Sequence, residues 1–202
     1  MKAIRIAAAI TNLFSLCLIC AACEDAQELS STAIILGVGI DGGEGQIELT
    51  VELSSADSEE AIVLQAKDGS IDACVKSIQL SNYEHLYWGG TAAVIFGSDL
   101  ADEYAECCAL YLYSDLGVSG KTPVLKAWNC SGADILKGQF GQARYTAVGI
   151  GEALRIVESG NNAAFLTLAQ RLETQMEQGE QERTAMVTID EDGSVKMVDT
   201  TQ

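Results

Sequence analysis

The sequence has few basic residues, one histidine and one proline. Its 12 Lys and Arg stand against 29 Asp and Glu, which gives a formal net charge of −17 at pH 7. This balance excludes a nucleic-acid backbone as partner and electrostatic docking on anionic lipid, because both are polyanions. A single proline together with 48% hydrophobic residues excludes an intrinsically disordered chain.

The sequence also contains no recognisable catalytic or metal-binding motif. Among Cys23 and the four later cysteines at 74, 107, 108 and 130, no two have Cys-x-x-Cys spacing, and together with the lone His85 this argues against a zinc site. His85 has no evident nucleophile partner, no nucleophile-elbow serine is present, and the many carboxylates are scattered. We therefore predict no enzyme activity, no catalytic residue, no metal and no cofactor.

The first residues have the pattern of a secretory signal. Lys2 and Arg5 precede a mostly apolar stretch over residues 6–22, which ends in Ala-Ala directly before Cys23. A basic start, an apolar middle and small residues at the cleavage site predict a signal peptide over residues 1–22. In bacterial lipoproteins a cysteine at this place receives the lipid, so we predict lipidation of Cys23 and a membrane anchor. A secreted protein with a free Cys23 and an uncleaved anchor are the alternatives.

Cleavage after residue 22 would leave residues 23–202, enough for one domain. Loss of Lys2 and Arg5 would change the net charge from −17 to −19. Cys74, Cys107 and Cys108 lie in helical patterns, mostly on faces expected to be buried. Disulfides among these three and Cys130 stay open.

A β-hairpin is predicted at the start of this domain. Residues 32–40 are a nearly continuous apolar run, and residues 41–45 form a glycine-rich turn. Residues 46–53 then alternate with period two, which indicates a strand with one buried face. The inward positions are Ile47, Leu49, Val51 and Leu53, and the outward ones are Gln46, Glu48, Thr50 and Glu52.

The rest of the chain predicts a mixed sheet with helices packed on it, an α+β fold. Residues 54–69 have the polar character of a surface loop, and Ser70 is placed to cap a helix whose apolar residues recur at Ile71, Cys74, Val75 and Ile78. The other expected elements are strands at 91–97 and 122–128, a helix from Asp99 with a stripe through Cys107 and Cys108, a short helix at 131–137, helices near 151–158 and 162–178, and a hairpin of strands 184–189 and 195–198 around Asp192-Gly193.

Residues 37–42 match the Gly-x-Gly-x-x-Gly pattern of dinucleotide-binding folds. That mechanism needs a helix directly after the glycines, with free N–H groups facing a pyrophosphate. Because an alternating strand follows here instead, we predict no dinucleotide site.

Several segments, in order, resemble the spore germination receptor C subunit, the Ger(x)C lipoprotein family. The family pattern has a lipid cysteine, a Glu-Leu pair and a run like A-I-V-x-G-x-G-I-D, which correspond to Cys23, Glu28-Leu29 and residues 33–41. Later matches are residues 86–90, residues 97–101 and the Asp-Ile-Leu of residues 134–136. The family's Trp-Asp-x-Arg stretch and one histidine are replaced here by residues 24–27 and Gly90.

The resemblance implies a non-enzymatic subunit of a nutrient germinant receptor. It would lie on the outer face of the inner spore membrane, beside integral-membrane receptor subunits. Family members are considerably longer, so the resemblance also implies that residues 23–202 are the family's N-terminal domain and that its C-terminal domains are absent. Alternatives from other classes are a solute-binding lipoprotein of a transporter and an extracytoplasmic hydrolase.

Overall fold

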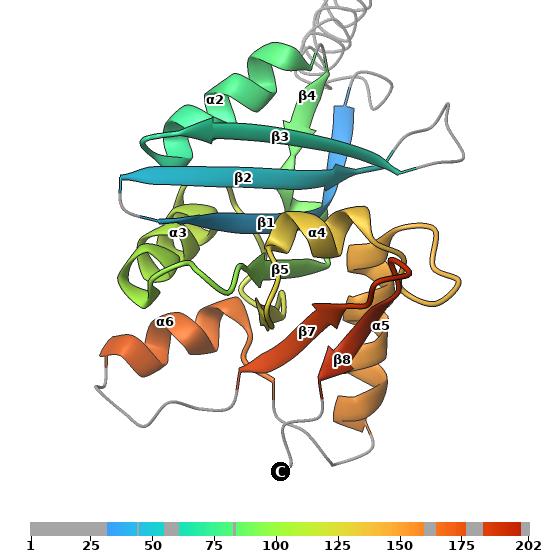
Figure 1. Cartoon of the computed structure of the whole chain (residues 1–202). Coiled ribbons are helices and arrows are strands. Elements are labelled where there is room, and N and C mark those ends of the chain that lie inside the picture. The colour runs from blue at the N-terminus through green and yellow to red at the C-terminus, as the bar shows by residue number, and fades with distance from the viewer. Residues whose placement is uncertain are drawn as a thin grey trace, which may run out of the picture. The chain divides into compact units, whose positions relative to one another are not determined.

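Figure 1 shows a computed structural model that describes residues 32–43, 45–54, 61–82, 84–159, 165–176 and 184–198. The signal peptide and Cys23, expected within residues 1–31, lie outside these ranges and stay predictions. Among the described helices, none is long and apolar enough to cross a membrane.

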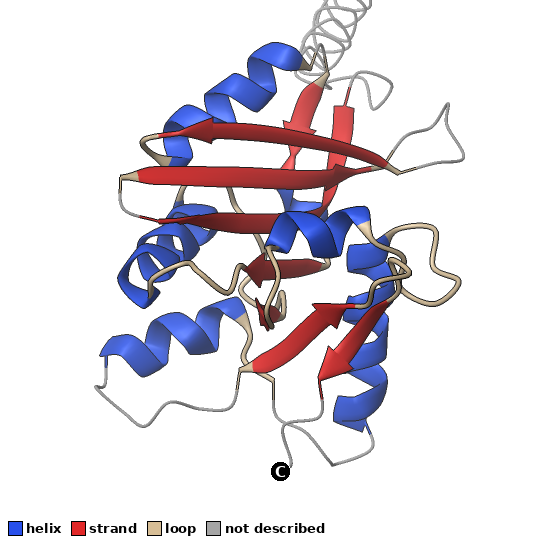
Figure 2. Ribbon diagram, viewed as in Figure 1, coloured by secondary structure: helices blue, strands red, loops and turns tan. Residues whose placement is uncertain are grey.

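A mixed sheet of eight strands runs through the described residues (Figure 2). Its strand order is β3-β2-β1-β5-β6-β7-β8, and β4 pairs with β1 beside this path. The pairs β1–β5, β5–β6 and β6–β7 are parallel, while β1–β2, β2–β3 and β7–β8 are antiparallel. The predicted α+β class and the N-terminal β-hairpin are thereby confirmed. The strands are β1 (Thr32–Gly43), β2 (Gln46–Leu53), β3 (Ile62–Asp68), β4 (His85–Tyr87), β5 (Ala93–Phe96), β6 (Val124–Ala127), β7 (Ala185–Ile189) and β8 (Val195–Val198).

Helices cover both faces of this sheet. The described helices are α2 (Ile71–Ser81), the short 3-10 helix η2 (Trp88–Gly90), α3 (Asp102–Ser114), α4 (Gly132–Lys137), α5 (Thr146–Ser159) and α6 (Leu168–Met176). A first core joins α2, α3 and the start of α6 to one face, and a second core joins α4 and α5 to the other.

Apolar burial in these two cores holds the fold together. The first core contains Ile35, Val38 and Ile40 of β1, and the second contains Ile135 and Ile150, all fully buried. Each such side chain stabilises the folded chain by about 1.5–3 kcal/mol. The described ion pairs lie on the surface, as between Lys126 and Asp102 at 3.6 Å, and such a pair contributes at most about 1 kcal/mol.

Helix α2 begins and packs as its sequence predicts. The Ser70 hydroxyl accepts a hydrogen bond from the Ala73 N–H at 3.2 Å, which satisfies a donor that the first turn leaves free. Ile71, Cys74 and Ile78 are buried against β2 and β3. The closing hairpin is confirmed as well, since Gly193 has the positive φ of +83° that its turn requires.

Some predicted boundaries are wrong. Residues 62–68 are not loop but strand β3, which pairs with residues 47–53 of β2. Its pattern is weak because only Leu64 and Ala66 pack on the first core. Helix α3 begins at Asp102 instead of Asp99, because the Leu100 N–H bonds to the Gly97 carbonyl at 3.3 Å in a turn that precedes the helix.

Candidate functional site

The glycines of β1 let two helices come close to the centre of the sheet. A Cβ on Gly37 would lie 2.5 Å from the Ala147 Cβ of α5, and a Cβ on Gly39 would lie 2.9 Å from the Gly132 backbone of α4. Real Cβ atoms do not approach other atoms this closely. The Gly-Val-Gly run is therefore a docking strip for the starts of α4 and α5.

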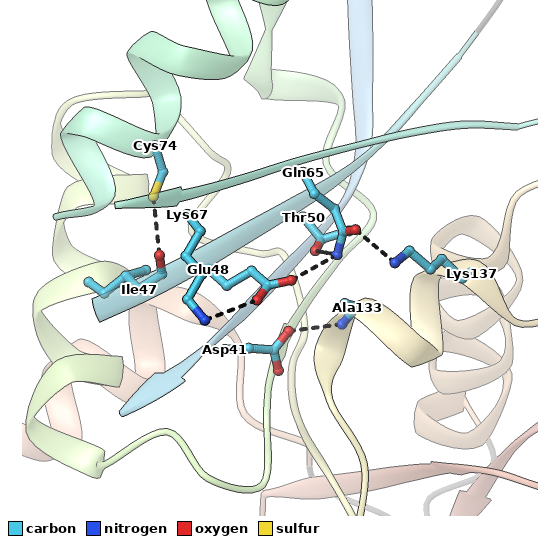
Figure 3. Close-up of polar contacts among 9 residues, drawn as sticks. All are labelled: Asp41, Ile47, Glu48, Thr50, Gln65, Lys67, Cys74, Ala133 and Lys137. Atoms are coloured by element: carbon cyan, nitrogen blue, oxygen red, sulfur yellow. Dashed lines mark hydrogen bonds and ion pairs between the residues drawn. The ribbon is translucent and has the colours of Figure 1, made fainter. Parts of the chain in front are cut away.

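Asp41, two residues further along the same face of β1, holds the start of α4. Its carboxylate accepts hydrogen bonds from the Gly132 N–H at 2.6 Å and from the Ala133 N–H at 2.9 Å, and Figure 3 shows the second of these bonds. Burial raises the pKa of this carboxyl, while the two backbone donors lower it and nearby Glu48 and Asp134 raise it further. The Gly-x-Gly-x-Asp segment thus secures a helix of its own chain, and β2 follows it as predicted.

Glu52 of β2 holds the start of α5 by hydrogen bonds, as Asp41 holds the start of α4. Its carboxylate accepts from the Thr146 N–H at 2.7 Å and the Ala147 N–H at 2.9 Å, and the side chain is 1% exposed. Burial raises the pKa of this carboxyl, and the two donors partly offset that rise. Because these N–H groups are satisfied from β2, α5 begins at Thr146, earlier than the predicted start near Gly151.

A row of polar side chains crosses β2 and β3 beside α4 (Figure 3). The Gln65 amide donates to Thr50 at 3.0 Å and to Glu48 at 3.1 Å. The Lys137 ammonium donates to the Gln65 carbonyl oxygen at 2.7 Å, and Lys67 lies 3.9 Å from Glu48. These groups satisfy one another, so the row stabilises the sheet surface.

The predicted outward face of β2 is therefore only partly outward. Thr50 and Glu52 are buried, because α4 packs on β2 and the first residues of α5 bond to Glu52. The alternation correctly predicted the strand and its core-facing residues, but it could not indicate that helices cover part of the other face.

A polar hollow of about 790 Å³ lies at the carboxyl ends of β5 and β6. The Trp128 side chain is half exposed there, and Asn129 has a φ of +56°, a left-handed conformation that asparagine tolerates better than most residues. The carboxyl ends of parallel strands are a frequent place for ligands in α/β sheets. The other lining residues include Ser98, Asp99, Lys126, Cys130 and Met186.

The four described cysteines are free thiols. Cys74 and Cys108 are buried, and the Cys74 thiol donates to the Ile47 carbonyl at 3.4 Å (Figure 3). Burial raises the pKa of Cys108 to about 12. Cys107, which the predicted stripe placed with buried residues, is exposed, because α3 turns Ala105, Cys108, Ala109 and Leu112 toward the core.

The aromatic segment around His85 has both buried and exposed side chains. Trp88 is buried, whereas Tyr87 is half exposed and His85 is exposed at the start of β4. Within the described ranges, no three His, Cys, Asp or Glu side chains are grouped so that they could hold a metal ion.

The two carboxylates with the clearest structural task were missed from the sequence. Asp41 stood in the predicted turn and Glu52 on the predicted polar face, and each has its helix more than 90 residues later in the chain. No pattern in the residues around Asp41 or Glu52 predicts a hydrogen-bond partner so far away in the chain. The only signal is the glycine spacing ahead of Asp41, which resembles a nucleotide fingerprint but serves helix docking.

Comparison with known families adds the context for this arrangement. Residues 25–126 match the family model described as the spore germination protein N-terminal domain. The match contains the docking strip, Asp41 and Glu52, and it ends before α4 and α5. No match was found among curated proteins or among solved structures.

Proposed function

Because the chain belongs to the family of spore germination protein N-terminal domains and so has a role in spore germination, we propose that it is a membrane-anchored subunit of a nutrient germinant receptor. In this role it is an interaction subunit without enzyme activity. Its partners are integral-membrane receptor subunits, and its place is the outer face of the inner spore membrane.

The family match carries this proposal. It begins at Asp25, immediately past the hydrophobic stretch and Cys23, so the family domain would follow the lipidated residue directly. A lipid on Cys23 supplies the membrane affinity that a chain of net charge −17 does not obtain from anionic headgroups.

The non-enzymatic role is supported by what the buried carboxylates do. Both carboxylate oxygens of Asp41, and both of Glu52, accept hydrogen bonds from backbone N–H groups at the start of a helix. A general acid or base needs an oxygen directed at a substrate proton. Both carboxylates are instead part of the packing between β1, β2 and the helices.

The proposal is tested by Cys23→Ala in sporulating cells, with Cys20→Ala as the matched control in the same hydrophobic stretch. Membranes are isolated, and mass spectrometry identifies the N-terminal residue and the proteins purified with the chain. We expect a lipidated Cys23 and integral-membrane germination subunits with the wild type and Cys20→Ala, and loss from membranes with Cys23→Ala. Full membrane retention of Cys23→Ala would contradict the lipid anchor.

The hollow at the ends of β5 and β6 favours a second candidate, a solute-binding lipoprotein of a transporter. Its volume of about 790 Å³ lies within the range of small-molecule sites. The same purification separates the candidates, because a transporter permease with its ATPase among the companions would replace the receptor proposal. A lipidated chain that brings neither group would leave the receptor proposal without its partners and count against it.

A further inference from the structure

Helix α3 has a second face that no described segment covers. Its buried side holds Ala105, Cys108, Ala109 and Leu112. The periodicity of the helix places Glu103, Cys107, Leu110 and Ser114 on the opposite side. Glu106 and Tyr113 lie along one edge, where Glu106 interacts electrostatically with Arg171 of α6 and Tyr113 lies beside Gly120, as Ala169 of α6 does. We call these six residues the α3 outer face.

The α3 outer face is apolar in its middle. Leu110 is 52% exposed and Tyr113 is 47% exposed. Cys107, which lies one turn before Leu110, is exposed as well. A surface helix usually has one apolar stripe, which faces the core, and polar residues elsewhere. Exposed apolar groups that lie together on one element indicate a contact surface more than single exposed side chains do.

The charge that the α3 segment itself carries has one sign. Residues 99–115 contain five acidic residues and no basic one. Two basic side chains lie near this helix: Lys126 pairs with Asp102 at 3.6 Å, and the Arg171 guanidinium lies over the Phe96 ring at 5.1 Å and interacts electrostatically with Asp102 and Glu106. Glu103 and Glu106 flank the apolar middle without an ion pair among the described side chains.

This charge decides which occupant fits. A second copy of the chain would bring the same acidic residues opposite one another, and an anionic membrane surface would repel them. A segment with Lys or Arg beside large apolar side chains complements both properties of the face.

We propose that the α3 outer face is the docking site for a basic amphipathic segment of a protein partner. Leu110 and Tyr113 receive its apolar side chains, and Glu103 and Glu106 pair with its basic ones. This inference extends the proposed receptor role by naming the surface that holds a partner, and it can fail while the lipid anchor on Cys23 stands.

Cys107 provides a built-in reporter of this face. Its thiol is exposed, whereas Cys108 is buried with a pKa raised to about 12 and Cys74 is buried as well. The rate at which a hydrophilic maleimide alkylates Cys107, followed by peptide mass spectrometry, therefore measures whether the face is covered.

The first experiment uses detergent-extracted full-length protein and a synthetic helical peptide with Lys and Leu on separate faces. A peptide of the same pattern with Glu in place of Lys is its control. We expect only the basic peptide to slow alkylation of Cys107 at low salt, with Cys130 as the internal reference. Equal protection by both peptides, or by neither, would overturn the proposal, as would protection that grows with protein concentration alone.

A matched pair of variants tests the residues. Glu103→Gln with Glu106→Gln should weaken binding of the basic peptide about tenfold, because two of the complementary charges are gone. Glu84→Gln with Glu191→Gln removes the same charge from exposed positions outside the face and should leave binding unchanged. Equal weakening by both pairs would mean that only net charge matters and would reject the site.

The second experiment asks whether the face is covered where the protein works. Cys107 is alkylated in membranes of sporulating cells and in the purified protein. Slower alkylation in membranes, restored by Leu110→Ser, supports the proposal. Equal rates in a preparation whose Cys23 is lipidated and whose receptor subunits are present would reject the α3 outer face but keep the proposed function.

Discussion

The Glu52 carboxylate lies 2.9 Å from the Ala147 N–H and caps a helix that begins 94 residues beyond it in the chain. A buried carboxylate with two backbone donors is stable only while both donors are in place. The start of α5 and the end of β2 therefore depend on each other. Asp41 and the start of α4 form the same kind of pair, so the hairpin holds both helices of the second core.

The pH dependence of stability should reveal Glu52. Burial raises the pKa of its carboxyl above the ordinary 4.5, so between 4.5 and the raised value the folded chain holds a proton that the unfolded chain has released. The free energy of unfolding therefore falls as pH rises through that window. Asp41 contributes in the same direction, since its pKa is raised from 3.8.

Glu52→Gln removes the Glu52 part of this decline. Its amide nitrogen cannot accept a hydrogen bond, so one helix donor loses its partner and the variant is destabilised by about 1–3 kcal/mol at low pH. Urea unfolding at several pH values measures both effects. Glu84→Gln, at an exposed position, should keep the wild-type slope. An unchanged slope in Glu52→Gln would contradict our assignment of the raised pKa.

Valine at Gly37 or Gly39 should disturb the docking strip. The added carbon atoms would overlap Ala147 or the Gly132 backbone, and overpacking of this kind costs about 1–3 kcal/mol or more. Gly43→Ala is the control, because nothing lies within 4 Å of a Cβ there. Thermal unfolding distinguishes them, and a wild-type transition in both valine variants would remove the steric role that we give these glycines.

The thiols should differ sharply in reactivity. Maleimide at neutral pH is expected to modify Cys107 first, Cys130 more slowly, and Cys74 and Cys108 only after unfolding, since burial both shields these thiols and raises their pKa. Mass spectrometry of peptides after a timed reaction gives the order. Early modification of Cys108 would show that α3 opens readily or faces the other way.

Tyr111 should titrate late. Its hydroxyl donates to the Asp72 carboxylate at 3.0 Å, and burial together with this bond raises its pKa to about 12. Asp72→Asn should bring that pKa back toward 10, because the negative charge beside the phenol is lost. Ultraviolet absorbance of the phenolate follows the titration, and Tyr111→Phe identifies its share of the signal. No change in Asp72→Asn would mean that burial alone sets the pKa.

Sequence patterns correctly predicted those helices and strands that are determined by residues close to one another in the chain. Helix α2 follows from Ser70 and its apolar spacing, and the last hairpin follows from Asp192-Gly193. Strand β3 was missed because an edge strand with one packed face needs few apolar residues. The start of α5 was missed because its cap, Glu52, arrives from a different part of the chain.

In the candidate site, too, the sequence indicates which residues are special but not which distant residues they contact. The glycines at 37 and 39 were singled out from their spacing, but the space they leave is filled by Ala147 and Gly132, which no window around residue 39 contains. The predicted stripe contained both Cys107 and Cys108, but only Cys108 faces the core, because apolar residues lie on both sides of α3. A periodicity argument cannot choose between two apolar faces.

The long reach of Asp41 and Glu52 also sets an order of events during folding. The β1–β2 hairpin can close as soon as its residues are available, since its contacts are local. Until residues 132–147 arrive, however, both carboxylates must stay hydrated, and the glycine strip lies bare. We expect the second core to close late, so a chain that folds from its N-terminus would pass through a state whose β1–β2 hairpin is formed and whose second face is still open to chaperones and proteases.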